Sequence, residues 1–367
     1  MSDMLTKFDS WLTGDAGPAA LVIREHLMPV EGPDGVLFPA TFAAAEDKTK
    51  FPGGYNIDKF PDGKNVCLID TVGSQANRIE PLFAGEQYAK LVPQVVIEAG
   101  ENAVKLLEAG HRAGDAIVRC TALQKELQAA FKAVLKGDAQ RLAKIAPTSL
   151  VFGAWDSRDT QAKLPRLIAS TIRAFDVRAL TRSAQFVPAT EYVANALLDD
   201  PTDKAGKDAY AERGFIHVPA SGTPGGVIAT GGIRRDATLS LNALRLLRAG
   251  NDSEKTLALR RYILGLALVA FTHSPSGYLR QGCNLVLDPE KPREFVEVYG
   301  DGRRIPAKVT PDDALPYAKA AAEAFGVGGD RTVKFDKELA KRDVQGDSAK
   351  EKKGKGGGRK GAKPEES

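Results

Sequence analysis

The stretch VFGAWDSRDTQAKLPR, residues 151–166, carries the strongest structural signal in the chain. An apolar, strand-like run ends at Gly153, and a polar loop follows it. Beyond the loop, apolar residues recur at the spacing of a helix, namely Leu164, Leu167, Ile168, Ile172 and Phe175. The cationic residues of this region fall on the opposite side of such a helix: Lys163, Arg166 and Arg173. We therefore predict a strand, a polar loop and a helix with one buried face and one basic face.

The charge of this region favours a phosphate-bearing partner. Residues 150–182 hold six Lys/Arg and three Asp/Glu, and Arg178, Thr181, Arg182 and Ser183 follow one another closely. Guanidinium and hydroxyl groups bind phosphate and ribose oxygens without reading bases. An ordinary solvated helix also has a charged outer face, so the local excess of positive charge is what favours nucleic acid.

Bulk composition is that of a globular protein and does not by itself indicate a nucleic-acid partner. The chain has 367 residues, of which 43% are hydrophobic and 27% are charged, with a net charge of +4. The whole of that excess lies after residue 340, because residues 1–340 hold 42 residues of each sign. Any anion-binding site in the body must therefore be a local patch.

The cysteines and the hydropathy pattern predict a cytoplasmic protein without a membrane span. Cys67, Cys120 and Cys283 are widely scattered, which argues against a disulfide framework or a thiolate zinc site. Acidic residues interrupt the first 15 positions, so we expect no secretory signal there. The most apolar run, residues 263–271, is too short to cross a bilayer and predicts a buried helix.

The remaining pattern predicts an α+β fold with an antiparallel sheet. Expected strands are 19–24, 66–70, 215–218, 227–230 and a pair at 284–287 and 294–298. Expected helices are 101–112, 121–136, 237–249, 254–272 and 312–325, with Ser74 as the N-cap of a further helix. Residues 29–65 predict an irregular excursion with a small hairpin, and 195–213 an exposed insertion. We expect one domain over residues 1–340 and a disordered, basic Lys/Gly-rich tail over 341–367.

The sequence gives little support for several other catalytic or ligand-binding sites. The Gly-rich loop 219–226 and Gly231-Gly232 match no phosphate-loop pattern, and the four histidines have no metal-ligand spacing. Asp156 and Asp159 are more typical of helix capping or pairing with Arg158 than of metal binding. The segment 278–284 combines an aromatic ring with basic and amide groups, and we interpret it as a polar turn or as further backbone contacts. No cofactor and no metal are expected.

Three long motifs, in this order, resemble those of a known family. They are DTVGSQANRIE (70–80), the stretch 151–166, and LTRSAQ (180–185). Together they are similar to the CRISPR-associated RAMP superfamily, and specifically to the Cas-seven backbone subunit of the type I-U (I-G) Cascade complex. The resemblance covers roughly residues 15–330.

The resemblance implies a fold and a function. The fold is an RRM-like (ferredoxin-like) antiparallel-sheet palm with helical finger insertions and a β-hairpin thumb, for which residues 30–62 and 186–230 are both candidates. The implied function is non-catalytic: several copies polymerise head-to-tail along one CRISPR RNA, together with other Cascade subunits, and present it for pairing with target DNA.

A guide of arbitrary sequence requires hydroxyl, amide and cationic contacts in place of base-edge readers. Carried over to this chain, the predicted guide-binding residues are Ser74, Gln75, Asn77, Arg78, Ser157, Arg158, Thr160, Gln161, Lys163, Thr181, Arg182 and Ser183, with Arg178 and Arg234 as additions. The family binds RNA at loops and helix ends, so the lack of an aromatic stacking pair in a strand is compatible with it.

Two other functions remain open from the sequence. A RAMP ribonuclease would cut guide precursor or target RNA, with Asp156 as the first candidate for a catalytic acid. A nucleotide-dependent small-molecule enzyme rests only on the glycines.

Overall fold

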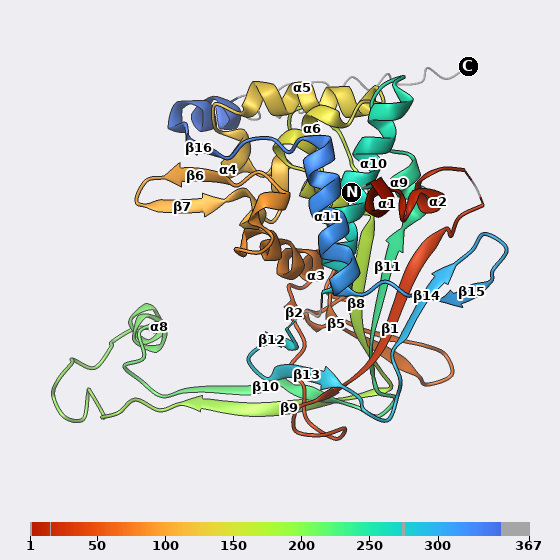
Figure 1. The fold of residues 1–367 in the computed structure, drawn as a ribbon. Coiled ribbons are helices and arrows are strands. Elements are labelled where there is room, and N and C mark those ends of the chain that lie inside the picture. Colours follow the sequence, from red (N-terminus) through yellow and green to blue (C-terminus); the bar gives the residue numbers. More distant parts are fainter. Residues whose placement is uncertain (1, 15, 274–275, 346–367) are drawn as a thin grey trace, which may run out of the picture.

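A computed structural model describes residues 2–14, 16–273 and 276–345 of the chain. A large antiparallel sheet forms one side of the molecule, helices pack on one of its faces, and a long hairpin projects from its base (Figure 1). The protein is therefore of the α+β class with a curled antiparallel sheet, as the sequence predicts.

The large sheet has nine strands in the order β12-β13-β1-β11-β8-β5-β4, with β14 paired to β1 and β15 paired to β14. Its strands are β1 (Ala20–Pro29), β4 (Ile57–Lys59), β5 (Asn65–Asp70), β8 (Ile168–Phe175), β11 (Ile233–Ser240), β12 (Tyr278–Arg280), β13 (Cys283–Leu287), β14 (Glu294–Val298) and β15 (Arg304–Pro306). One edge of β1 pairs with β11, and the other edge pairs with β14 near its start and β13 near its end. All of these pairs are antiparallel.

Alternate residues of the central strands are buried, which distinguishes the two faces of the sheet. In β11 the buried positions are Ile233, Arg235, Ala237 and Leu239. Their neighbours, such as Arg234 and Asp236, lie on the opposite face and are only half-buried.

Helices cover the face that holds the main core. The helices of this layer are α3 (Val72–Ile79), α5 (Gln124–Leu135), α6 (Gln140–Ile145), α7 (Thr148–Phe152), α9 (Leu241–Arg245), α10 (Ser253–Thr272) and α11 (Pro311–Phe325). Every residue of α10 from Tyr262 to Thr272 is buried, which confirms the predicted core helix. Gly265 lets α10 approach α11 closely, since an added Cβ would lie 2.8 Å from the Ala318 Cα.

Smaller elements complete the body. A three-stranded sheet has the order β16-β6-β7, formed by β6 (Val95–Ala99), β7 (Asn102–Lys105) and β16 (Arg331–Lys334). Short helices are α1 (Ser2–Thr6), α2 (Asp9–Leu12), α4 (Ala116–Arg119) and the 3-10 turns η1 (Glu80–Ala84), η2 (Ala89–Leu91), η3 (Leu106–Glu108) and η4 (Arg112–Gly114). The small hairpin predicted within residues 29–65 is present as β2 (Thr41–Phe42) paired with β3 (Gly54–Tyr55).

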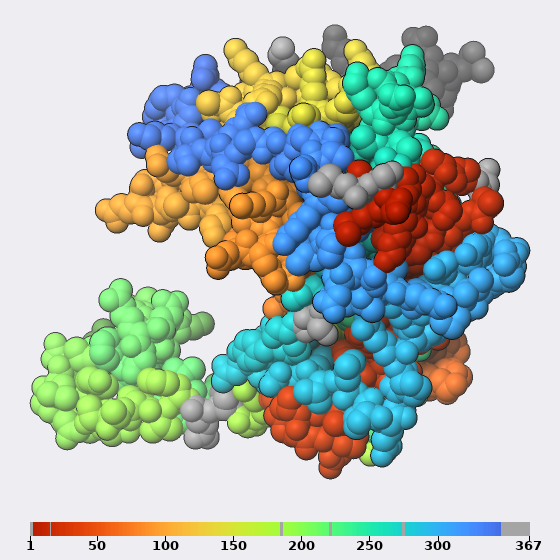
Figure 2. All heavy atoms as spheres, in the orientation of Figure 1, coloured from red at the N-terminus to blue at the C-terminus, as the bar shows by residue number. Residues whose placement is uncertain are grey.

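The projecting hairpin consists of β9 (Val177–Phe186) and β10 (Val218–Ala229). The segment between them carries α8 (Lys204–Glu212), which has no buried residue, and forms a lobe that stands apart from the body (Figure 2). At its root, Val227 forms a β-bridge with Leu37, and the Gly226 N–H donates a 3.0 Å hydrogen bond to the Tyr55 hydroxyl. The exposed insertion predicted at 195–213 is thus the tip of a hairpin.

The local structure predicted for the opening stretch is wrong. Residues 148–152 form helix α7 and not a strand, and residues 168–175 form strand β8 and not a helix. In β8 the buried residues alternate, as Ile168, Ser170, Ile172 and Ala174. Ile168 and Ile172 are four residues apart, a spacing that fits both a helical face and every second residue of a strand, so the apolar pattern alone did not separate the two.

Four other local predictions need correction. Residues 102–105 are strand β7 and residues 106–108 and 112–114 are short turns, so no helix spans 101–112. The Gly-rich segment 219–226 lies inside β10, where register shifts accommodate it. Residues 237–240 belong to β11, which ends before α9. Strands β13 and β14 each pair with β1 and not with one another.

The expected start of the tail at residue 341 falls inside a helix, because residues 337–345 are helical. Asp343 in this helix pairs with Arg119, with 2.9 Å between Oδ2 and Nη2. The rest of the predicted tail, residues 346–367, lies outside the described residues.

Candidate nucleic-acid interface

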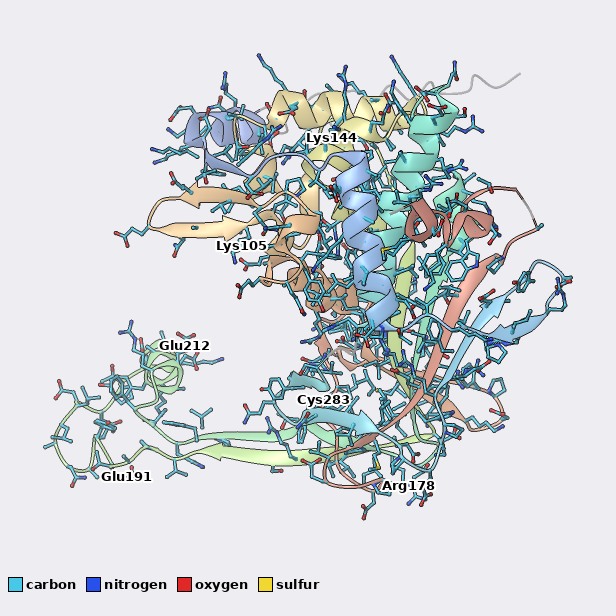
Figure 3. The ribbon with its side chains drawn as sticks, in the orientation of Figure 1. Lys105, Lys144, Arg178, Glu191, Glu212 and Cys283 are labelled. Carbon is cyan, nitrogen blue, oxygen red and sulfur yellow. The ribbon has the colours of Figure 1, made fainter. Side chains whose placement is uncertain are left out.

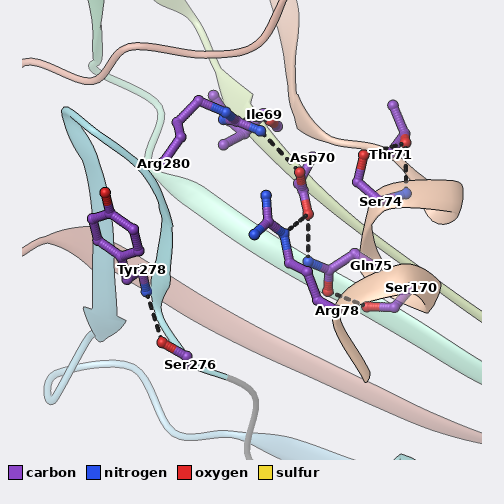
Figure 4. A network of polar contacts seen from close by, with 10 residues as sticks. All are labelled: Ile69, Asp70, Thr71, Ser74, Gln75, Arg78, Ser170, Ser276, Tyr278 and Arg280. Carbon is purple, nitrogen blue, oxygen red and sulfur yellow. Dashed lines mark hydrogen bonds and ion pairs between the residues drawn. The ribbon is translucent and has the colours of Figure 1, made fainter. Parts of the chain in front are cut away.

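The first motif folds around a buried carboxylate at the end of β5. Asp70 accepts hydrogen bonds at Oδ2 from Gln75 Nε2 (2.7 Å) and Arg78 Nε (3.2 Å), and at Oδ1 from Arg280 Nη2 (2.9 Å; Figure 4). Gln75 in turn accepts a 3.0 Å hydrogen bond from the Ser170 hydroxyl of β8. The network therefore joins β5, α3, β8 and β12 at one point.

Helix α3 begins earlier than predicted. Its N-cap is Thr71, whose hydroxyl accepts from the Ser74 N–H at 3.0 Å, so Ser74 lies inside the first turn and is not the cap. The hydroxyl of Ser74 accepts a 3.0 Å hydrogen bond from the Thr71 hydroxyl. The cap fixes the first turn of the helix next to the Asp70 network (Figure 4).

Two guanidinium groups share the single Asp70 carboxylate. The Asp70 side chain is fully buried, whereas those of Arg78 and Arg280 are 35% and 25% exposed. Two cations and one anion leave an excess of one positive charge. This excess charge lies at the surface, because the two arginines are partly exposed and the carboxylate is not. Such a preorganised pair is suited to binding a phosphate.

Arg112 joins the first motif to the second. Its buried side chain forms an ion pair with Glu80 (Nε to Oε2, 2.6 Å) and donates to the Gly153 carbonyl (3.2 Å) and to Asn77 Oδ1 (3.2 Å). Burial raises the pKa of Glu80 to about 7, although the Arg112 charge acts in the opposite direction. Burial likewise lowers the pKa of Arg112, and Glu80 counteracts this.

The loop of the second motif, residues 153–163, is held by its own polar groups. Asp156 is buried and accepts from the Thr160 N–H (2.8 Å), the Thr160 hydroxyl (2.6 Å) and the Asp159 N–H (3.2 Å). The loop leaves Gly153 with a φ of 77°, and a Cβ there would lie 2.7 Å from Arg166 Cγ. Arg158, Gln161 and Lys163 are exposed on this loop.

The third motif lies on a different element, strand β9 of the projecting hairpin. Arg178, Thr181, Arg182 and Ser183 are exposed or half-buried there. Figure 3 places Arg178 at the root of the hairpin, with Glu191 and Glu212 at its tip. Arg234 lies on β11, where its Nε donates to Asp236 Oδ2 (2.9 Å) and its guanidinium stacks over Phe175 (4.9 Å).

The predicted residues thus separate into two kinds. Gln75 is buried, and its side chain is hydrogen-bonded to Asp70 and Ser170. The other predicted residues are exposed or half-buried, and they are Ser74, Asn77, Arg78, Ser157, Arg158, Thr160, Gln161, Lys163, Arg178, Thr181, Arg182, Ser183 and Arg234. Several of these also have side-chain hydrogen bonds within the protein, namely Ser74, Asn77, Arg78, Thr160, Gln161 and Arg234.

Four residues of this region lie outside the predicted set. Arg112 was assigned to a helix, and no local pattern in the sequence shows that it reaches both motifs. Tyr278 and Arg280 lie in a cluster that the sequence already marks as aromatic and basic. Trp155 is 57% exposed, and the Lys163 Nζ lies 5.8 Å from its ring centroid. Its position within a basic, polar loop is the feature of the sequence that could have identified it.

Membrane spans and metal clusters are both absent from the described residues. Among them, no helix has the length and apolar character needed to cross a membrane. Nor does that part of the chain bring three or more His, Cys, Asp or Glu side chains into an arrangement able to hold a metal ion.

One comparison with known proteins gave a match. Residues 21–179 match the family model described as CRISPR-associated protein GSU0053 (Cas_GSU0053). This range runs from β1 to the start of β9 and includes Asp70, Arg78, Arg112 and the loop 153–163. No curated protein matches the chain. The family match supports a CRISPR-associated role for this chain.

Proposed function

We propose that this chain is the guide-RNA-binding backbone subunit of a Cascade-type CRISPR effector complex, of the Cas-seven type found in subtype I-U (I-G). Several copies bind head-to-tail along one CRISPR RNA, next to other Cascade subunits, and hold it for pairing with target DNA. The observation that carries the proposal is the joining of the first and second motifs by Arg112 within the range that matches a CRISPR-associated family.

The chemistry of the joined motifs supports a sequence-independent grip. The groups that reach the surface are guanidinium, ammonium and amide groups, from Arg78, Arg158, Lys163 and Asn77. These bind phosphate and ribose oxygens and leave base edges free. A guide that must pair with any target requires this property.

The strand order supports an RRM-like palm. The strands β14-β1-β11-β8 lie side by side, and along the chain they occur as β1, helices, β8, β11, α10 and β14. This is the β-α-β-β-α-β arrangement of ferredoxin-like folds. We assign α3 to the palm, residues 80–152 as the helical finger insertion and the hairpin β9–β10 as the thumb, which favours the 186–230 candidate over 30–62.

We propose that the chain performs no chemistry of its own. Asp156, the candidate acid of the alternative ribonuclease function, is buried and accepts three hydrogen bonds from its own loop. Those contacts favour a structural role. Asp156→Ala tests the alternative, because a loss of RNA cleavage by the purified protein would indicate a ribonuclease.

RNA binding by the purified chain tests the proposal. The double variant Arg158→Ala/Lys163→Ala should weaken binding by the same factor for unrelated RNA sequences. It should also lower the salt slope, by roughly 0.7 for each phosphate that the variant no longer neutralises. Arg303→Ala/Arg304→Ala removes the same charge in and next to β15, an edge strand of the large sheet, and should leave both quantities unchanged. A loss confined to one RNA sequence would contradict a backbone grip.

A further inference from the structure

Strand β12 places an exposed aromatic ring next to the Asp70 network. Along this strand Tyr278 is exposed, Leu279 is buried and Arg280 is partly exposed, and the pairing with β13 has a register irregularity between Tyr278 and Arg280. Tyr278 is 58% exposed, and Figure 4 shows it on the same strand as Arg280, whose guanidinium extends from that strand toward Asp70.

The position of the tyrosine is fixed by its backbone. Gly277 approaches β13 so closely that an added Cβ would lie 1.8 Å from the Leu285 carbonyl oxygen. The Leu285 N–H donates to the Gly277 carbonyl at 2.9 Å, and the Tyr278 N–H donates to the Ser276 hydroxyl at 3.2 Å. The ring is therefore presented to solvent from a well-anchored strand, although its exposure costs favourable burial of apolar area.

Arg280 is also held in place before any ligand arrives. It donates to the Ile69 carbonyl at 3.1 Å and to Asp70 Oδ1 at 2.9 Å. The other oxygen of the same carboxylate holds Arg78. One buried anion thus fixes two partly exposed guanidiniums, and ordering them requires little further loss of side-chain entropy on binding.

The combination of groups identifies the class of ligand. A fixed pair of guanidiniums matches the two non-bridging oxygens of a phosphate. An exposed ring on the same strand as Arg280 matches a nucleobase, which every nucleotide carries whatever its sequence. An acidic peptide would use the cations but not the flat face of the ring, so single-stranded nucleic acid fits the site better.

We propose that Arg78, Arg280 and Tyr278 form one nucleotide subsite, in which the two guanidiniums bind a single phosphate and the tyrosine ring stacks on the adjoining base. The inference rests on the proposed RNA-binding function and extends the predicted interface to residues 278–280, outside the three motifs. The subsite adds an aromatic contact with RNA, whereas the guide-binding residues predicted from the sequence are all polar or charged.

Substitution of the exposed ring gives the direct test. Tyr278→Leu in the full chain should reduce the affinity for a uridine homopolymer about tenfold, as expected when one base no longer has a ring to stack on. Tyr278→Phe, which keeps the ring, should bind within about twofold of the native chain. Tyr299→Leu is the matched control on the hairpin of β14 and β15, and it should bind like the native protein.

RNA that lacks bases separates stacking from other effects. On an abasic RNA of equal length, the native chain and Tyr278→Leu should bind equally well, because the ring then has no base to contact. An equal loss on abasic and base-bearing RNA would overturn stacking. Unchanged binding of Tyr278→Leu to the uridine RNA, alongside weakened binding of Arg158→Ala/Lys163→Ala, would overturn the subsite and keep the proposed function. No RNA binding by the native chain would overturn both.

The shared phosphate is tested by combining substitutions. Arg78→Gln and Arg280→Gln should each weaken binding, and the double variant should lose less than the product of the two factors, because both changes disrupt the same phosphate interaction. Losses that multiply fully would place the two arginines on separate phosphates and overturn this part of the subsite. Melting temperatures of all variants identify any that fail to fold.

Discussion

A single buried cation determines the relation between two sequence motifs. Arg112 contacts Glu80, Asn77 and the Gly153 carbonyl, and its backbone adopts a left-handed φ of 55°. The sequence could predict the exposed residues of each motif from their types. It could not predict Arg112, because its role depends on a turn that brings residues 41 positions apart together.

Removing one partner of this buried ion pair should be far more costly than removing both. We expect Arg112→Met to lower the free energy of unfolding by roughly 3–5 kcal/mol, because Glu80 is left buried without its partner. Arg112→Met/Glu80→Met should recover most of that loss. Urea unfolding measures both values. RNA affinity should stay low in the double variant, since Asn77 and Gly153 still lack their common donor.

Glu80 should make stability depend on pH. Its pKa is raised from 4.5 to about 7, so the native protein binds more protons than the unfolded chain between these values. The free energy of unfolding therefore falls as pH rises through this window, at a slope of up to about 1.4 kcal/mol per pH unit. Glu80→Gln should remove this slope in urea titrations from pH 5 to 8. The exposed Glu98→Gln is the control, and parallel curves for Glu80→Gln and the native chain would contradict the assignment.

At the scale of elements, burial could be predicted better than the type of secondary structure. Leu164, Leu167, Ile168 and Ile172 are all buried as the pattern indicates, yet they lie in a loop and a strand. The sheet requires Ile168–Phe175 between β11 and β5, and these long-range pairings decide the outcome. Helix α10 was predictable because its apolar run is long, is unbroken by Pro or charge, and continues a helical pattern over residues 254–272.

The tip of the hairpin β9–β10 should contribute little to the thermal stability of the body. Its tip makes aromatic contacts of its own, with Tyr192 and Phe215 ring centroids 5.1 Å apart. Replacing residues 188–216 by a short Gly-containing turn should leave the melting temperature of the body within about 2 °C, because exposed loop tips tolerate such changes. Thermal unfolding by circular dichroism measures this.

Replacing Val227 by Asp is the contrasting change at the hairpin root. Val227 is fully buried in a core cluster with Leu37 and Leu279, so a charge there should unfold the root and lower the melting temperature clearly. A large loss of stability from the tip replacement, comparable with that of Val227→Asp, would show that the tip packs on the body.

The whole molecule presents its cationic groups unevenly. Residues 1–340 carry equal numbers of positive and negative side chains, so the proposed RNA binding would depend on local cationic surfaces, such as Arg78, Arg280 and the loop 153–163, and not on overall charge. Identical copies bound along one RNA would each repeat this surface, and head-to-tail contacts between them would form an open helical array. The sequence could predict this role only through resemblance, because no single motif encodes a self-contact.

Sequencing the nucleic acid that co-purifies with the chain tests the central claim most directly. The chain is expressed with a repeat–spacer array and its neighbouring genes, and the assembly is isolated with its mass determined. We expect small RNAs of uniform length with varied spacers, in a particle that holds several copies of this chain. A monomer free of nucleic acid would contradict the account.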